Sequence, residues 1–189
     1  MTKPNPANPT LSISRPDLAS ALEQIGAEIE HQPLRSSALA RIMRETFHGS
    51  DAGGTWDWRM AYDLMQATAV QALLRGDNSE DDYYAAKLLA SRLLTETRRS
   101  EQQIRLQQFS TPLPFAALTV RAAAIRKGET VLEPSAGTGA PAAFAARAGA
   151  TLLLNEIDPF RQRLLRAVFG GEVTGHDGEH IDDLLQTPV

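Results

Sequence analysis

The sequence predicts an α/β fold, in which an all-α helical region precedes a partial Rossmann-like sheet of about three parallel strands with helices. Three observations predict it. Apolar residues recur at helical spacing up to about residue 108, short apolar runs alternate with helical segments after it, and a glycine-rich turn follows the first of those runs. Strand–helix–strand alternation is typical of parallel sheets with crossover helices.

Composition limits the function classes. The chain has 189 residues, a net charge of -4 and a pI of about 5.6, which argues against a dedicated nucleic-acid coat. It has no cysteine, and its four histidines show no ligand spacing, so we expect no metal site. No apolar run approaches the roughly 18 residues of a membrane helix, and no signal peptide is evident, so we expect a cytoplasmic protein without membrane contact.

The first part of the chain divides into a tail and a helical domain. Residues 1–16 are polar and rich in proline, which predicts a disordered tail. Residues 17–108 form the expected helical domain. Its helices are expected from Asp17 to Pro33, from Leu34 to Phe47, from Thr55 (as the cap) to Arg75, and from Ser79 or Asp81 to Gln107. The buried side of the last helix is expected at Tyr84, Leu88 or Leu89, Leu93 and Ile104.

Residues 109–189 form the expected α/β domain. Strands are expected at 130–133, 151–155 and 172–174, and helices at 112–125, 140–147 and 158–169. The unbroken run Leu152-Leu-Leu154 suits a strand that is covered on both faces.

Acidic residues end or follow the expected strands. Glu133 closes the first, Glu156 follows the second and Asp177 follows the third, while Gly137 and Gly139 lie in the turn after the first. Since carboxyl ends of parallel strands meet at one crevice, these groups should surround one ligand. Two cofactor classes use such a turn. The first class is the dinucleotides, whose Gly-x-Gly-x-x-Ala motif the turn matches. The second is S-adenosylmethionine, which the carboxylates at the strand ends would bind.

Three segments carry a family resemblance. The segments Gln108-Phe-Ser-Thr-Pro112, Glu133-Pro-Ser-Ala-Gly-Thr-Gly139 and Asn155-Glu-Ile-Asp-Pro159 resemble the N6-adenine class of DNA methyltransferases. The stretch from Ile104 to Leu185, with His176-Asp-Gly-Glu-His-Ile-Asp-Asp183, is still more similar to the methylase-like region of bacterial and plasmid strawberry notch-like proteins. Those proteins join it to a helicase-like region.

The resemblance implies a class I S-adenosylmethionine-binding domain at 109–189 and a role for each matching residue. Thr111 and Pro112 would line the methionine end of the cofactor, and Glu133, Ser135, Gly137 and Gly139 would form the cofactor loop. Glu156 would bind the ribose hydroxyls, Ile157 would pack on adenine, and Asp177 would accept a hydrogen bond from the adenine amine.

The sequence departs from this family at the catalytic element. The family has Asn, Asp or Ser, then Pro-Pro and an aromatic residue, after its fourth strand, whereas Asp158-Pro-Phe160 has one proline and follows the second. The chain ends at Val189, about where a fourth strand is expected. We therefore assign no catalytic residue. We expect either a truncated part of a longer protein or a small plasmid or mobile-element protein, and no methyl transfer by the chain alone.

Partners and alternative functions stay open. Contacts with DNA or a nucleoprotein complex would use basic residues, and the open edge of a three-stranded sheet would suit a protein partner or a homodimer. The basic candidates are Arg98, Arg99, Arg105, Arg121, Arg126, Lys127, Arg161, Arg163 and Arg166. One alternative is a non-catalytic interaction or inhibitor protein that binds a nuclease, restriction or defence complex. Another is a nicotinamide-dinucleotide binder, which Glu133-Pro134 before the glycines disfavours.

Overall fold

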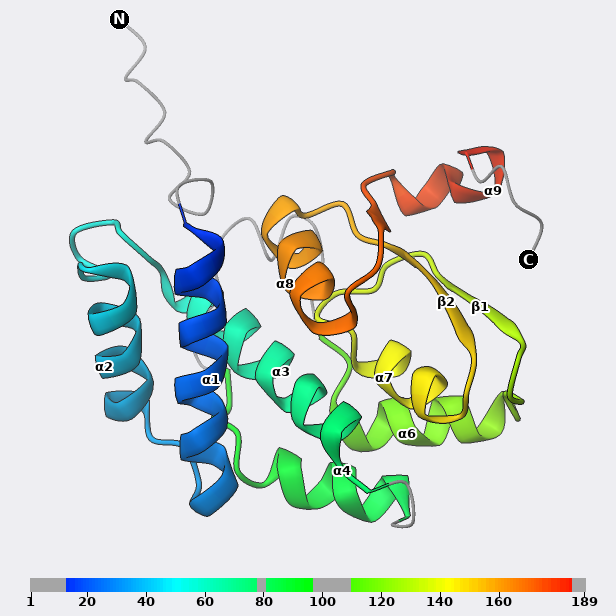
Figure 1. Ribbon diagram of the computed structural model, residues 1–189, viewed down its shortest axis with the longest axis horizontal. Coiled ribbons are helices and arrows are strands. Elements are labelled where there is room, and N and C mark those ends of the chain that lie inside the picture. Colours follow the sequence, from blue (N-terminus) through cyan, green and yellow to red (C-terminus); the bar gives the residue numbers. More distant parts are fainter. Residues whose placement is uncertain (1–12, 78–80, 97–109, 185–189) are drawn as a thin grey trace, which may run out of the picture.

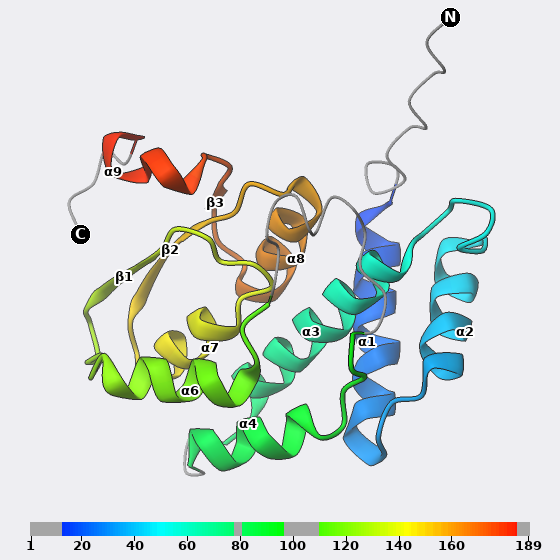
Figure 2. The same cartoon turned by 180° about the vertical axis from the view of Figure 1, so that it is seen from behind.

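The fold is α/β, with a bundle of helices beside a small parallel sheet (Figures 1 and 2). The computed structural model describes residues 13–77, 81–96 and 110–184. Residues 1–12 of the expected tail lie outside the described residues. Helix α1 begins at Arg15, where the hydroxyl of Ser14 caps it by accepting a hydrogen bond from the Asp17 N–H.

The first three helices confirm the expected ones within a few residues. They are α1 (Arg15–His31), α2 (Ser36–Phe47) and α3 (Trp58–Arg75). The predicted cap of α3 was wrong: Asp57, not Thr55, accepts a hydrogen bond from the Met60 N–H and begins the helix. α3 lies at the centre of the molecule and packs against α1, α7 and α8 (Figure 1).

The expected long fourth helix is wrong. α4 (Asp82–Ala90) begins at the predicted cap Asp81 but ends well before residue 107. The chain turns at Ser91, and the sulfur of Met65 then accepts a hydrogen bond from the Leu94 N–H. Leu89 and Leu93 pack on the core as expected, while Tyr84 and Leu88 are 69% and 56% exposed. Ile104 lies outside the described residues.

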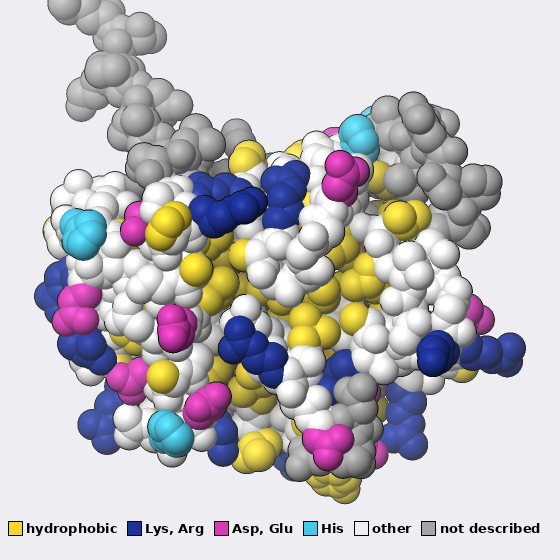
Figure 3. Space-filling model, viewed as in Figure 1, with side chains coloured by type: hydrophobic (Ala, Val, Ile, Leu, Met, Phe, Trp, Pro, Cys, Tyr) yellow, Lys and Arg dark blue, Asp and Glu magenta, His cyan; other side chains and the backbone are white. Residues whose placement is uncertain are grey.

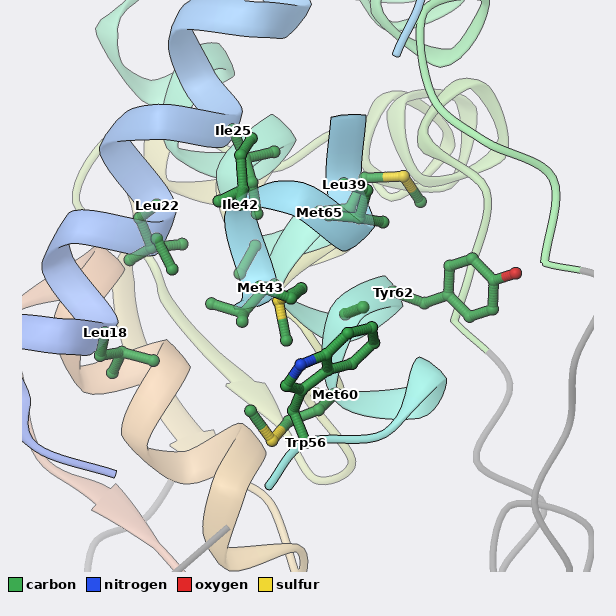
Figure 4. Close-up of a cluster of buried hydrophobic side chains, with 14 of the residues drawn as sticks. Leu18, Leu22, Ile25, Leu39, Ile42, Met43, Trp56, Met60, Tyr62 and Met65 are labelled. Carbon is green, nitrogen blue, oxygen red and sulfur yellow. The ribbon is translucent and has the colours of Figure 1, made fainter. Parts of the chain in front are cut away.

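The largest hydrophobic cluster fills the space between α1, α2 and α3 (Figure 4). Leu22, Ile25 and Ile42 contribute aliphatic side chains to it, and Trp56 is 2% exposed. Phe160, far along the chain, belongs to the same cluster. A second cluster likewise combines α3 and α4 with α6 and α7. Both clusters thus combine side chains from the two sides of residue 108. The division of the chain into two domains there stays a prediction.

The sheet confirms the expected strand–helix order. The elements of this part of the chain are α6 (Leu113–Ala122), β1 (Thr130–Glu133), α7 (Ala140–Arg147), β2 (Thr151–Asn155), α8 (Pro159–Phe169), β3 (Val173–Thr174), η2 (Gly178–His180) and α9 (Ile181–Leu184). The strands are parallel in the order β1-β2-β3, and Glu133 lies beside Leu154 in register. The carboxyl ends of all three strands therefore meet at one edge.

The two faces of the sheet differ. Leu152 and Leu154 pack toward α7 and α8 together with Val173. Leu153 points to the opposite face, because side chains alternate along a strand, and it is half-buried there. Both views show α6 and α7 on one side of the sheet (Figures 1 and 2). Among the described residues β1 pairs only with β2, which leaves its outer edge without a strand partner.

Candidate functional site

The glycine loop, residues 134–139, connects β1 to α7. Gly137 and Gly139 have φ values of +58° and +93°, in the left-handed region that favours glycine. The Gly139 N–H donates to the Ala136 carbonyl, which closes the turn at 2.8 Å. A Cβ on Gly139 would lie 2.6 Å from Cε2 of Phe169 and 3.0 Å from Cδ2 of Leu165. Gly139 is thus required both by its φ and by the close approach of α8.

Glu156 holds this loop against the end of β2. One carboxylate oxygen accepts a hydrogen bond from the Gly137 N–H at 2.8 Å, and the other accepts one from the Asp158 N–H at 2.8 Å. Only 4% of the residue is exposed. Burial raises the pKa of Glu156, although both backbone N–H groups and the Arg161 guanidinium oppose that shift. Glu156 is therefore a buried acid that links two of the three expected site segments.

Asn155 connects the glycine loop to the turn after β3. Its amide nitrogen donates to the carbonyls of Pro134 and His176, at 2.9 Å each, and its oxygen accepts from the His176 N–H. The turn after β3 also lies directly on the glycine loop, since a Cβ on Gly178 would be 3.0 Å from the Pro134 carbonyl oxygen. The turns after β1, β2 and β3 thus form one continuous surface.

Glu133 ends β1 at this edge. The residue is half-buried, and burial raises the pKa of its carboxyl. Among the described residues no ion pair or hydrogen bond of its carboxylate is recorded. The group is consequently a partly desolvated acid whose charge is not balanced by a described cation.

The other predicted site residues lie on the surface. Ile157 is 46% exposed, Ser135 is exposed in the glycine loop, and Asp177 is exposed and caps η2. Thr111 and Pro112 are exposed before α6, where Pro112 is the capping position. No hydrogen bond within the described part of the chain joins either of them to the glycine loop.

Sequence reasoning missed a buried charge cluster beneath the site. Arg59 forms an ion pair with Asp158, and Arg161 forms one with Asp63 at 2.8 Å; all four are less than 10% exposed. The predicted DNA contact by Arg161 is wrong, because its side chain is buried against Asp63. Arg59, Asp63 and Gln66 fall at i, i+4 and i+7 of α3, a polar stripe that the sequence could have revealed.

The cluster shifts the pKa values of its members in opposite directions. Burial raises the pKa of Asp63, with Arg161 and Arg59 opposing the shift. Burial would also raise the pKa of Asp158, but the Arg59 guanidinium and the N–H groups of Arg161 and Phe160 lower it overall. For Arg161, burial is outweighed by the carboxylate of Asp63, which raises its pKa.

The described basic candidates lie on several elements and share their surroundings with acidic side chains (Figure 3). Figure 3 shows Lys and Arg side chains above the start of α1 and α8, with acidic side chains on the same face. Arg121 pairs with Asp81, and Arg166 donates to the Val173 carbonyl. Arg98, Arg99 and Arg105 lie outside the described residues. Contact with DNA stays a prediction.

Neither a metal centre nor a membrane-spanning helix is found within residues 13–77, 81–96 and 110–184. No grouping of three or more His, Asp and Glu side chains suitable for a metal ion occurs among them. None of their helices combines the length and apolar character needed to cross a bilayer. Comparisons with family models, curated proteins and solved structures each give no match. The candidate site therefore stands on the geometry of the three strand-end turns.

Proposed function

We propose that the chain is the S-adenosylmethionine-binding part of an amino-methyltransferase-like protein, with a partial Rossmann-like fold of that class. The single observation that carries the proposal is the convergence of the glycine loop, Glu156 and the turn after β3 at one edge of a parallel sheet. Ligands of open α/β sheets bind at this edge.

The charge at this edge favours an adenosyl ligand over a dinucleotide. Glu133 and Glu156 both lie there, and the Gly137 N–H that a pyrophosphate would need already donates to Glu156. S-adenosylmethionine carries a sulfonium and an ammonium group, whose positive charges complement these acids. The nicotinamide-dinucleotide alternative is disfavoured for the same reason, because its diphosphate would add negative charge.

Each predicted contact has a chemical role in this proposal. Ile157 offers an apolar surface to adenine, and Asp177 accepts a hydrogen bond from the exocyclic amine. Glu156 accepts from the ribose hydroxyls with the lone pairs that Gly137 and Asp158 leave over, or in exchange for one of those backbone groups. Thr111, Pro112 and Ser135 complete the methionine end. No residue is assigned to methyl transfer.

Calorimetric titration of the full chain with S-adenosylmethionine, S-adenosylhomocysteine and NADH tests the proposal. We expect binding of both adenosyl ligands and none of NADH, and weaker binding after Ile157→Asp, which removes the apolar surface. Leu118→Asp, the same kind of change at an apolar residue of α6 with similar exposure, is the matched control. A folded protein that binds neither adenosyl ligand at millimolar concentration would contradict the proposal.

The unpaired outer edge of β1 favours a second candidate, a non-catalytic interaction protein or homodimer. An edge strand presents free N–H and C=O groups on which another chain can pair. Sedimentation velocity over a wide concentration range, with hydrogen exchange at residues 130–133, tests self-association. Strong protection that increases with concentration supports it, and a monomer with fast exchange at every concentration contradicts it.

A further inference from the structure

The polar stripe of α3, defined as Arg59, Asp63 and Gln66, reaches the candidate site from outside it. α3 is otherwise almost entirely apolar where it is buried, as in its neighbours Met60, Leu64 and Ala67. Buried polar groups are costly unless they find partners. Every side chain of the stripe has partners in the segments that follow β1 and β2.

Arg59 and Asp63 hold the turn between β2 and α8. Asp158 caps α8 by accepting from the N–H groups of Phe160 and Arg161, and its own N–H donates to Glu156. The ion pair of Arg59 with Asp158 fixes this turn from the α3 side. The Asp63 carboxylate accepts from Nε and Nη2 of Arg161 at 3.0 and 2.8 Å. Asp63 thereby sets the place of the guanidinium that acts electrostatically on Glu156.

Gln66 holds the glycine loop itself. Its side-chain oxygen accepts a hydrogen bond from the Thr138 hydroxyl at 3.0 Å, and its amide nitrogen donates to Glu96. Thr138 is 3% exposed and lies between the two glycines with positive φ. This partly buried hydrogen bond adds a contact from α3 to those that Glu156 and Asn155 make with the loop, and so is expected to restrict the loop further.

We propose that the polar stripe of α3 is a positioning element of the ligand site, which couples ligand occupancy to the helical region. This inference rests on the proposed adenosyl-binding function and adds the regulation of that same site. Because coupling between two sites is reciprocal, a ligand that orders the glycine loop also strengthens its contacts with α3. Ligand binding is thus expected to restrict the motion of α3 as well as that of the glycine loop.

The test uses the full chain and S-adenosylhomocysteine as the probe. Gln66→Ala and Thr138→Val each remove the hydrogen bond between helix and loop, and each should weaken binding by about threefold to tenfold. The double variant should bind about as weakly as Gln66→Ala, because Thr138→Val then removes a hydrogen bond that is already lost, whereas Gln66→Ala also removes the bond to Glu96. Thr138→Ser keeps the hydroxyl and should restore affinity. Gln71→Ala, the same change elsewhere on α3, should leave it unchanged.

Hydrogen exchange separates positioning from simple stability. In the wild-type protein, ligand should slow amide exchange both in residues 136–139 and in α3, and Gln66→Ala should abolish the effect in α3. If the wild-type protein binds and Gln66→Ala binds equally well with the same protection of α3, the inference is overturned while the proposed function stands. If the wild-type protein binds no adenosyl ligand, the proposed function fails first. Circular dichroism at the titration temperature verifies that each variant is folded.

Discussion

The carboxylate of Glu156 accepts hydrogen bonds from two backbone N–H groups, those of Gly137 and Asp158, and so ties the glycine loop to the end of β2. Glu156→Gln offers one acceptor oxygen in place of two, so one buried N–H would face an amide NH2 group. We expect the free energy of unfolding to fall by about 1–3 kcal/mol, the cost of an unsatisfied buried group. Urea denaturation followed by circular dichroism measures this loss.

Glu179→Gln is the control for that experiment, since Glu179 is exposed on η2. A surface change of this kind should alter the free energy of unfolding by less than about 0.5 kcal/mol. Equal effects of the two substitutions would show that Glu156 does not hold the loop.

Alanine substitutions at Gly139 and Gly170 distinguish the cost of backbone strain from the cost of close packing. Both have positive φ, +93° and +75°, but a Cβ would collide with Phe169 and Leu165 only at Gly139 and has open space at Gly170. Gly170→Ala should therefore cost only the left-handed backbone strain, about 1–2 kcal/mol. Gly139→Ala should cost about 1–3 kcal/mol more, as overpacking does. Thermal unfolding of both variants measures the difference, and equal losses would contradict the contact between the glycine loop and α8.

Sequence alone predicted the parts of the structure that depend on local patterns. The three strands, the glycine turn and helix α7 were confirmed, because short apolar runs, glycines and small residues specify them locally. The meeting of Glu133, Glu156 and Asp177 at one edge follows from the parallel order of the strands. Their ligand roles remain predictions, because each depends on a bound molecule.

The sequence did not predict the features that depend on contacts between distant parts of the chain. The periodicity of residues 82–107 predicts one long helix, but α4 ends at Ala90 because Leu93 and Leu94 turn back onto α3. The sequence places Arg161 among the candidates for DNA contact, because its buried partner Asp63 lies 98 positions earlier in the chain. Such pairings have no local signal apart from the polar stripe of an otherwise apolar helix.

The buried pair of Arg59 and Asp158 should matter more for stability than any surface pair. Arg59→Met leaves the Asp158 carboxylate buried without its cation, and we expect a loss of about 3–5 kcal/mol in the free energy of unfolding. Adding Asp158→Asn to that variant should restore part of the loss, because asparagine still caps α8 and carries no charge. Arg41→Met is the control: Arg41 pairs with Glu28 on the surface, and its loss should cost about 0–1 kcal/mol. A similar loss in both arginine variants would contradict this ranking.

Glu133 should make stability depend on pH. Burial raises its pKa in the folded protein above the value of about 4.3 in the unfolded chain. Between these two pKa values the folded protein binds the extra proton, so this group makes the free energy of unfolding fall as pH rises through that window. Glu133→Gln removes the contribution and should make the variant relatively more stable above the window than below it. Urea titrations of both proteins across the acid range measure the difference, which would be independent of pH if the Glu133 carboxyl were fully solvated.

A cationic ligand should offset the effect of burial on the pKa of Glu133. Under the proposed function, the positive groups of S-adenosylmethionine stabilise the ionised form of Glu133 and lower its pKa. Affinity should therefore fall as pH falls through the raised pKa of Glu133 in the free protein, because the carboxyl takes up a proton and its attraction for the ligand is lost. Glu133→Gln should bind more weakly at neutral pH and lack this part of the pH dependence. Calorimetric titrations at several pH values compare the two proteins. Parallel pH profiles would show that Glu133 does not face the charged end of the ligand.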